Sequence, residues 1–393
     1  MSVIYAKTEK WDEGLPLGNG YFGSIVYGGR PLKITVDRTD LWDLRPNETT
    51  LEKGFNYDNL VKLSLSGDPS AWKERERLFE DIFMGKSYPS KITAGRIELD
   101  FGNCVKDVRY SLDTREAKVN VYDDKRLIAE IFTPSGINVG VVRTFGKCDL
   151  SLHVPAYLSG KPQGESGIGN SAADLSLGYP PAIEKRDGAF AWYEQKTHTD
   201  YAFGIVTYET NGLIYYTLVT TDDDRDYVTF GRNLLEKAAK IGYNALFAAH
   251  KREWKKYHRL SSVKTGDRSI DETYEKSWYL FKCCSRKGGY PMPLQGVWTA
   301  DNDCLPPWKG DYHHDTNTEL SYQSYLKANR LEAGEAFIDY LWKLRPTYEK
   351  FAKNFFGVDG LLIPSCSTLD GKPMGGWAQY SLSPTMTIWA AQS

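Results

Sequence analysis

The hydrophobic pattern changes character along the chain. Up to about residue 230, apolar and polar positions alternate in short runs rich in β-branched and aromatic residues, as in KVNVY at 118–122. A period of two gives a strand one buried and one solvent-facing side. Turn residues separate the runs about every ten positions, which predicts an antiparallel sandwich or barrel rather than alternating βαβ units. The runs are YFGSIVYGG, PLKITVD, GRIELDFG, VRYSLDT, EAKVNVYDD, RLIAEIFTP, INVGVVRTF, YAFGIVTYET, LIYYTLVTT and DYVTFG.

Two segments of this first part depart from the strand pattern. AWKERERLFEDIFMG at 71–85 places apolar residues at helical spacing among charges, which predicts a helical insertion. KPQGESGIGNSAADLSLG at 161–178 is rich in Gly and Ser and predicts a long exposed loop. This segment is either a flexible surface loop between strands or part of the rim of a binding cleft.

After residue 232 the apolar residues recur at three- and four-residue spacing, which predicts helices. The predicted helices are one long connecting helix at 233–260, a second at 267–289 ending at a Gly pair, and two more at 316–328 and 331–355. The predicted fold class is multidomain, β then α. Its domains are a large β-sandwich over 1–232, a helical linker over 233–266 and an α-helical domain over 267–393.

The final stretch, SPTMTIWAAQS, keeps an amphipathic helical pattern up to Ser393 without a cap or a polar tail. The helices after residue 267 are too few to close a toroid and would leave apolar faces open to water. We therefore expect this sequence to be the front part of a longer protein. The alternative is a short domain whose core closes against the sandwich.

Length and charge limit the classes of protein to which this chain can belong. A chain of 393 residues predicts two or three domains. Its net charge of −2, with acidic and basic residues interspersed, argues against a nucleic-acid partner and a basic membrane-binding surface. No apolar run reaches the roughly 18 residues of a transmembrane helix, and the N-terminus lacks a signal pattern. We expect a cytoplasmic chain; removal of a signal peptide would make a secreted or periplasmic location the alternative.

The six cysteines are sparse and show no C-x-x-C spacing, which predicts reduced, mostly buried thiols rather than a disulfide scaffold or a zinc site. With six histidines and no H-E-x-x-H pattern, neither a metal nor another cofactor is expected. The sequence does not indicate the oligomeric state.

Aromatic content points towards carbohydrate. Trp, Tyr and Phe make up 13% of the chain, with 26 tyrosines and 11 tryptophans. Flat amphipathic rings stack on sugar faces, although they also fill large cores. The stretch WKGDYHHDTNTELSYQSY at 308–325 adds acids, an amide and adjacent histidines to such rings. A single Trp is typical of core packing, but the combination predicts one wall of a sugar-binding cleft. The candidates are Trp298, Trp308, Asp311, His313, His314, Asp315 and Asn317.

Two blocks resemble glycoside hydrolase family 95, whose members are α-L-fucosidases and α-L-galactosidases. The first is WDEGLPLGNGYFGSIVYGG followed by ITVDRTDLWDLR. The second, PMPLQGVWTADNDCLPPWKGDYHHDTNTELSYQSY, is similar to the family's LQGIWN…PPW…DYHLNINLQMNYW block. The resemblance implies a β-sandwich, a linker and an (α/α)6 barrel, of which a part would lie beyond Ser393. It also implies a carbohydrate substrate.

The resemblance assigns roles to residues of the second block. In the family, two asparagines position the attacking water, a distant aspartate activates them, and a glutamate is the general acid. Asn317 matches the second asparagine, whereas Asp315 stands at the first. A carboxylate can accept the proton of water, so Asp315 fits a direct general base. It also fits a ligand for a different sugar hydroxyl, or the N-cap of a helix that starts near Thr316. His313 matches the family histidine expected beside the sugar.

The remaining matches are less complete. PSCS at 364–367 stands where the family has H-N-T-D, and Trp377 remains a candidate ring of the cleft. Adjacent side chains rarely face one site, so a two-histidine metal site at His313 and His314 is not expected. DRTDLWDLR at 37–45 fits either internally paired Asp and Arg side chains or a wall of the active site. The family's general acid and distant aspartate would lie beyond Ser393.

The leading prediction is a glycoside hydrolase, inverting by resemblance, that acts on an α-linked fucose- or galactose-like sugar. Asp315 and Asn317 would activate the water, and His313, His314, Trp298, Trp308, Asp311 and Trp377 would bind substrate. A non-catalytic carbohydrate-binding homologue is the first alternative. A polysaccharide lyase is the second, although such enzymes need basic residues in the cleft and this block has little besides Lys309.

Overall fold

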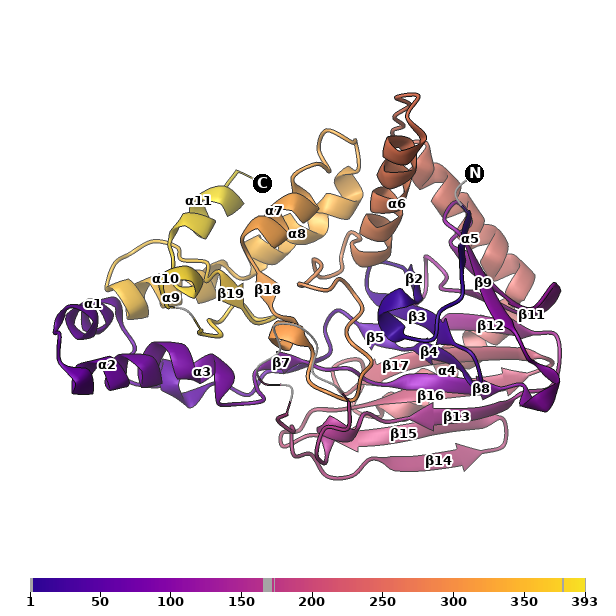
Figure 1. Cartoon of the computed structure of the whole chain (residues 1–393), viewed down its shortest axis with the longest axis horizontal. Helices are drawn as coiled ribbons and strands as arrows, with labels where there is room; N and C mark the ends of the chain where they lie inside the picture. The colour runs from indigo at the N-terminus through magenta and orange to yellow at the C-terminus, as the bar shows by residue number, and fades with distance from the viewer. Residues whose placement is uncertain (1–2, 165–171, 173, 377, 393) are drawn as a thin grey trace.

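The computed structural model describes residues 3–164, 172, 174–376 and 378–392. Its first part contains two large antiparallel sheets, and its second part is helical (Figure 1). The predicted fold class, a β-sandwich followed by the helices of a partial barrel, is therefore confirmed. Within the described residues, no helix is both long enough and apolar enough to cross a membrane.

The larger sheet has nine strands and the smaller has six. In spatial order the larger sheet runs β1 (Val3–Ala6), β9 (Val108–Asp113), β10 (Lys118–Asp123), β11 (Arg126–Phe132), β12 (Gly140–Thr144), β17 (Leu213–Thr220), β16 (Ala202–Thr210), β15 (Phe190–Lys196) and β14 (Ile183–Asp187). The smaller sheet runs β13 (Asp149–His153), β8 (Arg96–Asp100), β4 (Leu32–Thr35), β3 (Phe22–Gly28) and β2 (Leu15–Gly18), with β5 (Asp37–Arg38) beside β3.

Side-chain alternation fixes the inner face of each sheet. In β10, Val119 and Val121 are fully buried and lie opposite Leu112 and Tyr110 of β9, while Asn120 between them is half-buried. The period of two in KVNVY thus separates core-facing from water-facing positions. The main core continues from these strands to Trp278 and its neighbours in α6 (Arg268–Cys284).

The helical insertion predicted at 71–85 is present, and it begins earlier than expected. It contains α1 (Tyr57–Leu65), α2 (Pro69–Arg75), a π-helical turn at Glu76–Glu80 and α3 (Asp81–Met84). Although it belongs to the first part of the sequence, it packs on α9 (Arg345–Phe356), at the left of Figure 1. The rings of Phe55 and Phe79 lie 5.3 Å and 6.5 Å from the ring of Phe355.

The single connecting helix predicted at 233–260 is wrong, because the segment forms two helices. They are α4 (Tyr227–Ile241) and α5 (Tyr243–His258), and they break at Gly242, which has a φ of +83°. A positive φ favours Gly and ends a helix. The run DYVTFG, predicted as a strand, instead begins α4, whose side chains join an apolar cluster on the larger sheet.

The later helices are shorter than predicted. The helix expected at 316–328 ends as α7 (Thr316–Tyr322), and the one expected at 331–355 divides into α8 (Leu331–Lys343) and α9. Pro346 stands in the first turn of α9, where its missing N–H is tolerated, so the break falls just before it. Two short helices, α10 (Ala378–Ser381) and α11 (Thr385–Ala390), follow. Part of the loop predicted at 161–178 lies outside the described residues.

Candidate active site

A pair of very short strands brings the candidate residues together. β18 (Tyr312–His313) pairs antiparallel with β19 (Cys366–Ser367), and His313 lies opposite Cys366. Just before β18, Trp308 and Lys309 both have a positive φ, +48° and +55°. Two consecutive residues other than Gly in this region mark a strained turn, a feature common at functional sites.

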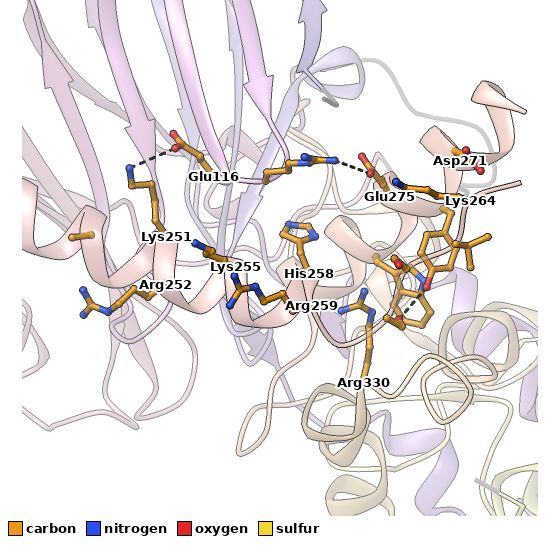
Figure 2. Close-up of a pocket in the computed structure, with 17 residues that line it drawn as sticks. Glu116, Lys251, Arg252, Lys255, His258, Arg259, Lys264, Asp271, Glu275 and Arg330 are labelled. Atoms are coloured by element: carbon orange, nitrogen blue, oxygen red, sulfur yellow. Dashed lines mark hydrogen bonds and ion pairs between the residues drawn. The ribbon is translucent and has the colours of Figure 1, made fainter. Parts of the chain in front are cut away.

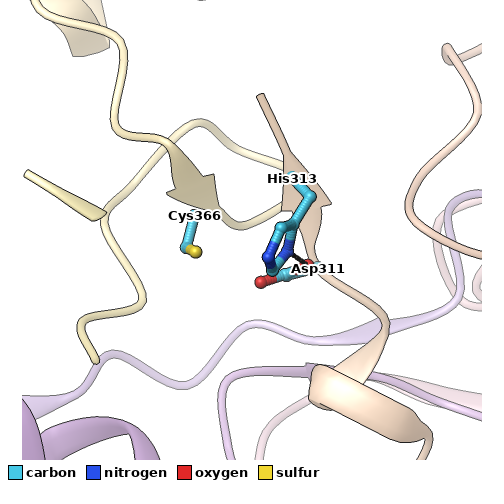
Figure 3. A group of neighbouring side chains, drawn as sticks. All are labelled: Asp311, His313 and Cys366. Atoms are coloured by element: carbon cyan, nitrogen blue, oxygen red, sulfur yellow. Dashed lines mark hydrogen bonds and ion pairs between the residues drawn. The ribbon is translucent and has the colours of Figure 1, made fainter. Parts of the chain in front are cut away.

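The buried Asp311 and the partly buried His313 form the base of the site (Figure 3). They are two positions apart on extended backbone, so their side chains lie on the same side. The Asp311 Oδ1 lies 2.6 Å from the His313 Nδ1. Burial opposes a charged imidazole, but the hydrogen bond and the charge of Asp311 outweigh it and raise the pKa of His313. This favours a protonated His313, which can donate a hydrogen bond through Nε2.

Cys366 completes a cluster whose Asp, His and Cys donor atoms lie within 4.8 Å of one another. Burial, and then the Asp311 carboxylate, raise the pKa of Cys366 far above its usual value, so the thiol stays protonated. Zinc accepts these donor types, but two ligands of a tetrahedral ion lie about 3.3 Å apart. The 2.6 Å contact of Asp311 with His313 is thus a hydrogen bond that an ion would have to open. The expectation of no metal stays a prediction.

Asp315 caps α7 and also binds Tyr380. Its Oδ1 accepts a hydrogen bond from the backbone N–H of Asn317 at 3.0 Å, so the predicted N-cap is confirmed. Its Oδ2 accepts one from the Tyr380 hydroxyl at 2.7 Å. The Tyr380 ring also lies 5.7 Å from the ring of His313. Tyr380 thereby holds the Asp315 carboxylate next to His313. Asn317 is exposed at the start of α7.

Tyr380 was not among the residues expected from the sequence. Burial, and then the hydrogen bond to Asp315, raise the pKa of Tyr380 well above its usual range, so the phenol remains a donor. Each oxygen of Asp315 has two lone-pair sites, so a water molecule can still bind to the carboxylate. The cap therefore leaves the general-base hypothesis open.

Other predicted residues lie in the packed interior. His314 is 1% exposed among the rings of Tyr312, Phe337 and Tyr340, which removes it from any surface that a sugar could reach. Trp298 is also buried, and its Nε1 donates to the carbonyl of Leu17 at 2.8 Å.

Of the remaining predicted rings, Trp308 is half-buried against the cluster around Trp42 and Tyr312. Trp377 lies outside the described residues. A substrate contact by either ring stays a prediction.

The segment 37–45 combines the two arrangements expected for it. Arg38 pairs with Asp40 and with Asp223, which lies after β17. Arg45 pairs with Asp43 at 2.6 Å. These pairs line a cavity of about 470 Å³ that also includes Tyr290 and Leu369 from the helical part. The acids are thus internally paired, and they also form a wall between the sandwich and the helical loops.

The buried His314 predicts a pH dependence of stability. Burial lowers the pKa of His314 from 6.5 to about 3. Between these values the unfolded chain binds one more proton at this residue than the folded chain, so falling pH destabilises the protein. Relative to a His314→Phe variant, the wild type should lose about 1.4 kcal/mol of unfolding free energy per pH unit between about pH 6 and 4.

Urea unfolding of both proteins across this range measures the difference. The difference in unfolding free energy between the two proteins removes the contributions of the other titrating groups, because both proteins contain them. A difference that does not change with pH would show that His314 is hydrated in the folded state.

Comparison with known proteins agrees with this architecture. Residues 4–227 match the family model described as "Glycosyl hydrolase family 65, N-terminal domain", and residues 242–393 match "Glycosyl hydrolase family 95 catalytic domain". The protein "Alpha-L-fucosidase 2" of Arabidopsis thaliana is 22% identical over 97% of this chain. The match covers 53% of that relative, so the chain spans about half its length.

The sandwich and the helical part, each matched by a glycosyl hydrolase family model, place the chain in the glycoside hydrolase class of proteins. Within that class, the chain belongs to the glycoside hydrolase family 95-like proteins.

Proposed function

We propose that the protein hydrolyses an α-linked fucose- or galactose-like sugar of an oligo- or polysaccharide with inversion of configuration. Asp315 is the general base, Asn317 orients the attacking water and His313 holds the sugar. The observation that carries the proposal is the position of Tyr380, which contacts both the His313 ring and the Asp315 carboxylate. Sugar binding and water activation are thereby joined in one cluster.

Inverting hydrolysis needs a base that activates water on one face of the sugar and an acid that protonates the leaving oxygen from the other. The two groups lie about 6.5–9.5 Å apart. Asp315 can accept the proton of water, which an asparagine cannot do with useful driving force. Its two hydrogen bonds hold the Asp315 side chain in one rotamer, and the exposed Asn317 in the first turn of α7 positions the water. We assign the general acid to a residue outside this cluster.

Sugar binding without hydrolysis is a second candidate. Both oxygens of Asp315 already accept a hydrogen bond, and the buried Cys366 adds no acid or base to the cluster at neutral pH. Such a site could hold a sugar through His313 and its neighbours without activating water.

Activated aryl glycosides test the proposal. A chloronitrophenolate leaves without protonation, so its release from an α-glycoside depends on the water-activating half of the site alone. We expect release from the α-L-fucoside or α-L-galactoside, and NMR should show the β-anomer of the free sugar first. Saturable binding without release would instead support the binding protein. An ultraviolet-absorbing product from a uronate polymer would indicate a lyase, and neither binding nor release would refute the proposal.

A further inference from the structure

A strongly basic cavity lies away from the candidate active site. It measures about 1040 Å³ and is lined by the turn between β9 and β10, by α5 and the loop after it, by α6 and by Arg330 (Figure 2). Seven Lys or Arg side chains line it against three Asp or Glu side chains. The whole chain carries a net charge of −2, so positive charge is concentrated here.

Only some of these cations are neutralised. Arg115 pairs with Glu275 at 3.2 Å and Lys251 with Glu116 at 3.5 Å. Lys255 and Arg259, one turn apart at the end of α5, are exposed and have no ion pair within the described residues. Unpaired cations of this kind attract an anion into the cavity, most strongly at low salt.

Arg330 is buried in the cavity wall without a carboxylate partner among the described residues. Its side chain is 2% exposed, and no carboxylate of the described residues lies within ion-pair distance of it. One nitrogen, Nη1, donates to the carbonyl of Tyr257 at 2.6 Å, but the buried Nε has no hydrogen-bond partner. Figure 2 shows the guanidinium pointing into the space between α5 and α6.

Ring contacts offset only part of the cost of burying Arg330. The guanidinium carbon lies 3.9 Å from the ring centre of Tyr257 and 4.8 Å from that of Trp278. Such contacts stabilise a buried cation less than a carboxylate partner would. An unpaired buried charge is destabilising, so an anion bound in the cavity would stabilise the protein. Burial, and then the charges of Arg330 and Arg115, lower the pKa of the neighbouring His258, in agreement with a positive potential.

We propose that this cavity binds an acidic oligosaccharide through its sulfate or carboxylate groups. Lys255 and Arg259 contact the anionic groups directly, and the buried Arg330 adds its charge to the potential of the cavity. Guanidinium groups match planar or tetrahedral oxyanions with paired donors. The half-buried Tyr274 ring in the wall provides a flat face for sugar. That the ligand is a glycan rests on the proposed function; that it is an anion rests on the cavity alone.

Calorimetric titration of the 393-residue protein at low salt tests the inference. The probes are a heparin-derived hexasaccharide, hexagalacturonate, neutral cellohexaose and a DNA hexanucleotide. We expect the two acidic sugars to bind, with affinity falling as salt rises, and the neutral sugar not to bind. A Lys255→Glu/Arg259→Glu variant should bind at least tenfold more weakly. A Lys237→Glu/Lys240→Glu variant, with the same charge change on α4, should bind as the wild type does.

Three outcomes would overturn the inference: no binding of either acidic sugar, equal binding of the neutral sugar, or wild-type affinity in the Lys255→Glu/Arg259→Glu variant. Equal or tighter binding of DNA would replace the glycan with a nucleic acid. Hydrolysis of aryl glycosides is scored separately on the same variants. Anion binding without hydrolysis would refute only the proposed function, and hydrolysis without anion binding only this inference.

Discussion

Replacing Asp315 with Asn is expected to lower kcat for an activated aryl α-glycoside by about 10²–10⁴-fold, the usual contribution of a general base. Asn keeps the size of the side chain and its oxygen acceptor, but it cannot take a proton from water. Asn is also as good an N-cap as Asp, so α7 should remain capped by the oxygen that now binds the Asn317 N–H. The substitution thus separates the catalytic role from the capping role.

Two further variants make the result specific. Glu319→Gln removes the acid in the first turn of α7 and should leave kcat almost unchanged, because Glu319 takes no part in the proposed reaction. Tyr380→Phe removes the hydrogen bond to Oδ2 and should lower kcat less than Asp315→Asn does, with KM nearly constant and a displaced pH profile. A loss below tenfold for Asp315→Asn, at unchanged substrate affinity, would assign Asp315 to capping alone.

Much of the sandwich could be predicted from the sequence, because apolar and polar residues alternate with a period of two along each strand. The alternation in 118–122 places Val119 and Val121 in the core without knowledge of their partners. Helix boundaries were predicted less well. Gly242 and Pro346 both carry a local signal for a break, yet the apolar periodicity on either side of each continues and conceals it.

The site was predictable where it depends on local chemistry. Asp315 before a helix indicates a cap, and the spacing of Asp311 and His313 on extended backbone places them together. The same geometry sends the adjacent His314 to the opposite side, into the core. Tyr380 was not predictable, because its contact with Asp315 spans 65 positions and depends on how the helical loops pack.

Long-range pairing also explains the wall formed by residues 37–45. The sequence placed Asp and Arg near one another there, but it gave no sign that Asp223 would join them. Arg38 donates to the carboxylates of both Asp40 and Asp223 and to the hydroxyl of Tyr21. Its side chain is 3% exposed, against 13% and 20% for the two carboxylates. Burial opposes ionisation of Asp40, but the Arg38 charge outweighs it and lowers the pKa of Asp40.

Arg38→Met should therefore lower the free energy of unfolding by about 3–5 kcal/mol, because it leaves two mostly buried carboxylates without their shared cation. Urea unfolding measures the loss. The triple variant Arg38→Met/Asp40→Asn/Asp223→Asn should recover most of it, since the remaining groups are neutral. Arg77→Met is the matched control: Arg77 also bridges two acids, Glu52 and Glu74, but on the surface, so it should cost about 1 kcal/mol or less. A loss at Arg38 no larger than the loss at Arg77 would mean that water in the adjoining cavity solvates the carboxylates, and that wall would then be open to solvent rather than fixed by its ion pairs.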